Sequence, residues 1–132
     1  MLDTNRRIEA TTKQNATQPS KTFRSSIVPK SFMLGGLRIN VNFDDNMVNT
    51  RKIIGEARYA EQAVWLDPYA APQQIVEQSY LHELTHWIFY IMNEDELRNN
   101  EKLVDLFAHL LYQALTSAEP LPEPSTESPE GE

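Results

Sequence analysis

The sequence predicts a single small α+β domain in which a short sheet comes first and two helices follow. The segment LRINVNF at residues 37–43 alternates apolar and polar side chains, as a half-buried strand does. Residues 73–92 and the stretch that ends near Ser117 have the composition and apolar spacing of helices. Strands that precede a pair of helices are typical of the α+β class.

The predicted sheet is small, with about three strands in antiparallel or mixed pairing. Its second part is IIGEARYAEQAVWLD, residues 53–67, where two short apolar runs flank a polar break at residues 60–62. This pattern indicates a hairpin.

Pro72 suits an early helical position, and the first helix is expected over residues 73–92. The polar stretch NEDELRNN, residues 93–100, is interpreted as a connection, and the second helix opens at Leu97 or Asn100. A short connection of this kind predicts that the two helices pair antiparallel.

The chain of 132 residues has the length of one ordinary domain. Residues 1–28 are polar and are expected to form a flexible arm, and residues 29–118 form the predicted domain. The remaining residues, 119–132, are rich in Pro, Glu and Ser, which favours a disordered acidic tail.

The composition narrows the classes of function. Cysteine is absent, so any metal must be bound by nitrogen and oxygen. The formal net charge of −7 argues against nucleic acid as a partner. No apolar run reaches the length of a membrane span or resembles a signal peptide, so a soluble cytoplasmic protein is expected.

The most informative segment is HELTH, residues 82–86, within the first helix. A helix turns by roughly 100° per residue, so His82 and His86 project from one face and can bind the same ion. Glu83 points about a quarter-turn away, where it can reach a water molecule on that ion and act as general base. The apolar neighbours WIFYIM predict a buried helix, in which unpaired polar groups would be costly. A metal site explains the two histidines and the glutamate better than a chance occurrence of the motif does.

A catalytic zinc usually has three protein ligands, and the second helix offers Glu101, Asp105 and His109 for the third position. In a short antiparallel hairpin that turns near residues 93 and 94, Glu101 is level with His86 and Asp105 with His82. Glu101 is then the favoured ligand, and Asp105 can orient His82 through the second ring nitrogen. If Asn100 is the N-cap, the connection lengthens and Asp105 or His109 becomes level with the metal instead.

HExxH followed by Glu101-x-x-x-Asp105 resembles the gluzincin pattern of zinc peptidases, which implies Zn²⁺ bound by His82, His86 and Glu101. From about Pro29 to Ala118 the chain resembles small phage-encoded HExxH metallopeptidase-like proteins. It is more distantly similar to the ImmA/IrrE family, whose E-x-x-A-N-x-F-A motif differs from this sequence at Val104 and Asp105.

The resemblance implies a minimal zincin-like peptidase that hydrolyses a protein or peptide through a metal-bound water activated by Glu83. It also implies an edge strand for the extended substrate, for which QAVWLD at residues 62–67 is the candidate. The alternative is that Val64 and Leu66 only pack on the helices. The alternative function is that of a zinc-containing phage regulatory or anti-repressor protein with little turnover, acting on a transcriptional repressor in the host cytoplasm. A third hypothesis is a structural metal site, with His109 as a fourth ligand.

Overall fold

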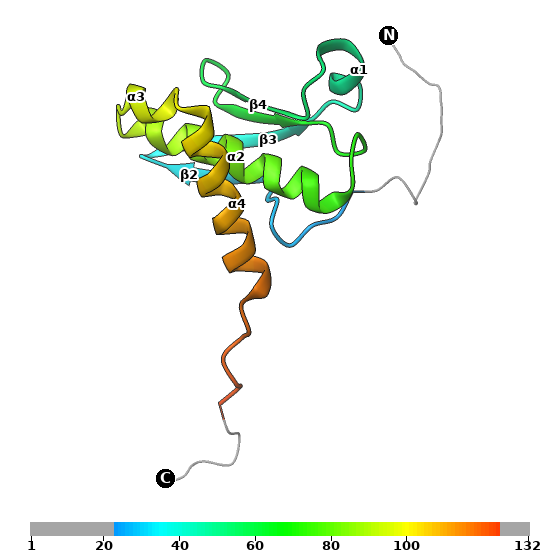
Figure 1. The fold of residues 1–132 in the computed structure, drawn as a ribbon, viewed down its shortest axis with the longest axis vertical. Helices are drawn as coiled ribbons and strands as arrows, with labels where there is room; N and C mark the ends of the chain where they lie inside the picture. Colours follow the sequence, from blue (N-terminus) through cyan, green and yellow to red (C-terminus); the bar gives the residue numbers. More distant parts are fainter. Residues whose placement is uncertain (1–22, 125–132) are drawn as a thin grey trace.

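The computed structural model describes residues 23–124 and confirms the α+β class (Figure 1). Within this part of the chain the sheet has four strands rather than about three, and its pairing is mixed. The strands and helices, in chain order, are β2 (Ser31–Leu34), β3 (Leu37–Phe43), α1 (Met47–Arg51), β4 (Gly55–Arg58), β5 (Ala63–Leu66), α2 (Gln73–Ile91), α3 (Asp95–Arg98) and α4 (Glu101–Ser117).

Strand β2 is the one that the sequence did not reveal. It is only four residues long, and it pairs antiparallel with β3 from Leu34↔Leu37 outward. Gly35 and Gly36 form the turn between them with φ values of 57° and 85°, a conformation that suits glycine. Its sequence, SFML, contains three consecutive apolar residues and therefore shows no alternation of apolar and polar side chains.

The order of strands is β2-β3-β5-β4, so the expected edge strand, β5, lies inside the sheet. It pairs in parallel with β3, at Val41↔Val64, and antiparallel with β4, at Ala57↔Val64. The prediction that QAVWLD forms the edge was wrong, because the parallel pairing with β3 joins segments that are distant in sequence. The edge strands are β2 and β4.

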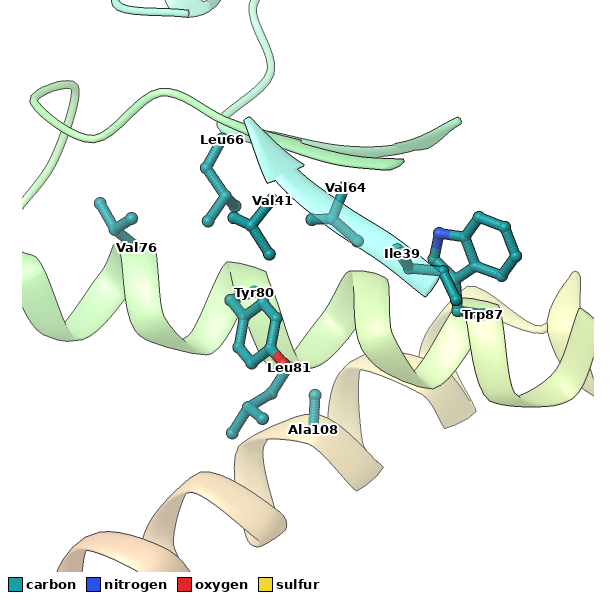
Figure 2. Close-up of a cluster of buried hydrophobic side chains, with 9 residues drawn as sticks. All are labelled: Ile39, Val41, Val64, Leu66, Val76, Tyr80, Leu81, Trp87 and Ala108. Carbon is teal, nitrogen blue, oxygen red and sulfur yellow. The ribbon is translucent and has the colours of Figure 1, made fainter. Parts of the chain in front are cut away.

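Helix α2 covers one face of the sheet and lies between it and α4 (Figure 1). The side chains that fill this interface form the core shown in Figure 2: Ile39, Val41, Val64, Leu66, Val76, Tyr80, Leu81, Trp87 and Ala108. The indole of Trp87 donates a hydrogen bond to the Ala63 carbonyl at 3.1 Å. From Val76 to Phe89 no side chain of α2 is exposed, as its apolar composition predicted.

The packed region begins earlier in the sequence than expected. Phe23, Ile27 and Val28, which the sequence assigned to the arm, pack against the core. They are isolated among polar neighbours, so no periodicity marked them. The rest of the predicted arm, residues 1–22, and residues 125–132 of the predicted tail lie outside the described residues, and residues 119–124 have no regular secondary structure.

Helix α4 begins at Glu101, and its N-cap is Asn100, whose side chain accepts a hydrogen bond from the Leu103 N–H at 3.1 Å. The polar connection before it contains the short helix α3, which the sequence did not predict. Four residues with no apolar periodicity give no signal for a helix. None of the described helices is long and apolar enough to cross a membrane.

Candidate metal centre

Three donor atoms from two helices converge at the surface of α2. The Nε2 atom of His82 lies 3.1 Å from one carboxylate oxygen of Glu101, and the Nε2 atom of His86 lies 3.2 Å from the other. One ligand atom from each of the three residues falls within 4.8 Å of the others. The sequence predicted that these three side chains would meet, and the structure brings them together.

The pairing of α2 with α4 explains why Glu101 is in this position. Three contacts follow one antiparallel register: Glu101 with His86, Asp105 with His82, and His109 with Gln78. The predicted register is therefore confirmed. The expectation that an N-cap at Asn100 would move Asp105 or His109 to the metal was wrong, because α3 makes the connection compact.

Each histidine also has a partner outside the cluster. The Nδ1 atom of His82 lies 3.4 Å from Oδ1 of Asp105. His86 forms a hydrogen bond with the backbone of Arg98, at the end of α3. Metal-binding histidines commonly donate their second N–H to a carboxylate or a carbonyl, which fixes the ring so that the other nitrogen faces the ion. Both imidazoles present Nε2 to Glu101.

His109 does not belong to this cluster. Its Nδ1 atom is 3.0 Å from the side-chain oxygen of Gln78, two turns along α4 from Glu101. Among the described residues the cluster therefore offers three donors, and the fourth ligand that a structural zinc site requires is absent.

Glu83 lies beside the cluster, under strand β4. Its side chain is 9% exposed, and a Cβ atom placed on Gly55 would be 3.2 Å from Cγ of Glu83. Glycine therefore makes room for the carboxyl group at this point of β4. Burial raises the pKa of Glu83 to about 7, opposed by the charge of His82 and by a hydrogen bond from the Ala57 backbone.

Two hollows of about 400 and 380 Å³ adjoin at the cluster and share four lining residues, Ile53, Gly55, His82 and Glu83. All three donors of the cluster line the second hollow, and His82 also lines the first. We call the two together the β4 groove, since β4 and the segment before it form one wall. The first hollow continues to Lys52, Gln78 and Asp105. The second continues to Tyr59, Arg98 and Asn99.

Tyr59, Tyr90 and Tyr112 are candidates for the group that stabilises the oxyanion, and the sequence alone does not rank them. The structure distinguishes them: of the three, only Tyr59 lines a hollow, the second one. The hydroxyl of Tyr112 donates to Glu77 at 2.7 Å, and the ring of Tyr90 stacks on Tyr59 with centroids 4.2 Å apart. Neither the role of Gly55 nor that of the Arg98 backbone had a signal in the sequence, because both depend on the packing of distant segments.

The donor set could hold a metal ion. The two imidazoles lie 3.1 and 3.2 Å from different oxygens of Glu101, and one ligand atom of each residue falls within 4.8 Å of the others, so the three side chains surround one position. Burial lowers the pKa of His86, which favours the neutral imidazole that metals bind.

No protein-family model matches the chain, and neither the curated proteins nor the solved structures contain a match.

Proposed function

We propose that the chain is a zinc-dependent peptidase of minimal zincin-like architecture that hydrolyses a protein or peptide bound along the β4 groove. The observation that supports this most strongly is the convergence of His82, His86 and Glu101 beside a buried Glu83. Zinc held by the three donors would lower the pKa of a water molecule and polarise the scissile carbonyl. The absence of a fourth donor among the described residues leaves a position for that chemistry.

Glu83 is the general base in this proposal. Its carboxylate accepts a proton from the attacking water and delivers it to the amine that leaves. A metal-free pKa of about 7 places the group near the pH at which such an exchange is efficient, and the charge of a bound cation would favour its ionised form. Contact with Gly55 on one side and the hydrogen bond from Ala57 hold the carboxylate in place.

Strand β4 takes over the role that the sequence assigned to β5. It is an edge strand, it lines the groove, and its free side can add an extended peptide through main-chain hydrogen bonds. Binding through the backbone makes few demands on the sequence of the substrate. Tyr59, at one end of β4, is the side chain that we place nearest to the reacting carbonyl on that side of the groove.

The decisive experiment compares wild type with Glu83→Gln after loading with zinc. The variant keeps the metal donors, so we expect full zinc content and a loss of peptide hydrolysis of at least about 100-fold. Glu61→Gln is the matched control, because Glu61 bonds to Trp65 and lies outside the residues that line the groove. Equal cleavage by Glu83→Gln and wild type would contradict the assignment. A wild type that binds zinc but leaves peptides and repressor proteins intact would instead favour a regulatory protein.

A further inference from the structure

Arg98 lies at one end of the β4 groove in a fixed position. Its guanidinium carbon is 5.4 Å from the ring centroid of Tyr59 and 5.8 Å from that of Tyr90, within cation–π range of both. Its Nη2 atom donates to Asp95 at 3.1 Å. A guanidinium held in this way loses little conformational entropy when it binds a ligand.

The guanidinium has hydrogen-bonding capacity to spare. Of its five N–H donors, one is paired with Asp95, another interacts with the side chain of Tyr59, and the buried Nε atom has no partner among the described residues. The side chain is 22% exposed and lines the hollow together with Tyr59 and Asn99. The remaining Nη donors, but not the buried Nε, are therefore available to a group bound in the groove.

The charges in this hollow favour an anion. Glu56 also lines it, but its carboxylate is paired with Arg51 at 2.6 Å and with Arg58 at 2.7 Å. The bond from Arg51 is the largest cause of a Glu56 pKa of about 2. Glu83 and Glu101 belong to the proposed metal centre. Among the described residues that line this hollow, Arg98 is the one Lys or Arg, and its ion pair with the exposed Asp95 uses one of its guanidinium nitrogens.

The course of β4 indicates which part of a peptide reaches Arg98. The chain leaves the hollow lined by Lys52, passes Gly55 and continues toward Tyr59 in the hollow of Arg98. A peptide that adds antiparallel to this strand runs the other way. Its residues on the amino-terminal side of the scissile bond would then lie beside Arg98.

From these contacts we infer that Arg98 is a specificity-determining residue that binds a carboxylate of the substrate. The inference rests on the proposed peptidase function and names its substrate class: peptides with Asp or Glu on the amino-terminal side of the cleaved bond. A carboxylate can accept two parallel hydrogen bonds from a guanidinium, an interaction that a neutral amide cannot reproduce.

The test uses the zinc-loaded full chain and a pool of synthetic decapeptides with one varied position, with the cleaved bonds mapped by mass spectrometry. Each peptide is made with Glu, Gln or Lys at that position and with a free or amidated carboxyl terminus. The readout is the ratio of kcat/KM for the Glu peptide to that for the Gln peptide within one enzyme. This ratio cancels any effect of a variant on metal content.

We expect a ratio of about tenfold or more in wild type, the size of a charge-assisted hydrogen bond. The ratio should approach one in Arg98→Met and be partly retained in Arg98→Lys. Lys52→Met, which removes the same charge from the other hollow, should keep the wild-type ratio. The free carboxyl terminus lies on the other side of the cleaved bond from Arg98, so we expect the ratio to be the same for peptides with a free and with an amidated terminus.

Two results would overturn the inference. In the first, wild type cleaves Glu and Gln peptides equally, which leaves the peptidase function standing and removes the role of Arg98. In the second, the preference persists in Arg98→Met, which would mean that another group of the protein binds the substrate carboxylate. A zinc-loaded wild type that cleaves no peptide in the pool defeats the proposed function itself, and with it this inference.

Discussion

The Nδ1 atom of His82 lies 3.4 Å from Oδ1 of Asp105, on the side of the ring opposite to the contact with Glu101. A single imidazole thus bridges two carboxylates that are one turn apart on α4. The arrangement assigns different tasks to the two acids, because only the one that faces Nε2 can share an ion with His86.

Replacement of Asp105 by alanine should weaken zinc binding without abolishing it. The ring of His82 would lose the partner that orients it, which typically costs roughly 10- to 100-fold in metal affinity. Competition with a zinc chelator measures the change. Glu96→Ala removes an equal charge from an exposed position of α3 and should bind zinc like wild type. If Asp105→Ala binds zinc as tightly as that control does, Asp105 has no part in the site.

Replacement of Glu101 by alanine should remove stoichiometric zinc from the purified protein. Two neutral imidazoles alone leave the ion with too few protein donors for a stable site. Metal analysis measures the zinc content of this variant. Lys102→Ala, a change at the neighbouring residue, is the control. The control should contain one zinc ion per chain. A Glu101→Ala protein that keeps its full zinc content would exclude Glu101 as a ligand.

A methyl group at position 55 should impair hydrolysis through Glu83. In Gly55→Ala the new Cβ atom would lie 3.2 Å from Cγ of Glu83 and 3.2 Å from Cδ2 of Leu66, so the carboxyl group must shift. We expect kcat to fall by about tenfold or more, since small displacements of a catalytic group are costly. Zinc content should be unchanged, because none of the three donors touches the new atom. A wild-type kcat in the Gly55→Ala variant would show that the close approach has no catalytic consequence.

The buried Glu83 should make the metal-free protein less stable as the pH rises. Its folded pKa of about 7 exceeds the ordinary value of 4.5, because burial disfavours the charge. Between these values the unfolded chain has lost a proton that the folded protein keeps. The free energy of unfolding should therefore fall by about 1 kcal/mol per pH unit across this window.

Urea unfolding of the metal-free wild type and of Glu83→Gln at several pH values isolates this effect. Both proteins retain the other acids, including Glu56 and Glu77, whose lowered pKa values act with the opposite sign. The stability of wild type relative to the variant should decline from pH 4.5 to 7 and then level off. A constant difference would mean that Glu83 is ionised throughout.

The part of the site that could be predicted from the sequence follows from helical geometry. A spacing of four residues places His82 and His86 on one face of a helix whatever the rest of the fold does. The prediction that Glu101 lies level with His86 followed from counting residues on either side of the bend at residues 93 and 94. That count succeeded because the connection, including α3, is as compact as a simple hairpin turn.

The parts that could not be predicted depend on pairing between distant segments. The position of β5 inside the sheet comes from its parallel pairing with β3, across α1 and β4. That pairing makes β4 the edge strand and brings Gly55 against Glu83. The hydrogen bond between His86 and the Arg98 backbone involves no side chain of residue 98, so no residue type could indicate it.

The most direct test of the metal centre is the anomalous diffraction of crystals of this chain grown with zinc, recorded on both sides of the zinc absorption edge. We predict one peak at the junction of α2 and α4, at bonding distance from Nε2 of His82, Nε2 of His86 and a carboxylate oxygen of Glu101. A map with no peak there, or with the two imidazole rings turned apart and zinc bound elsewhere, would contradict the account.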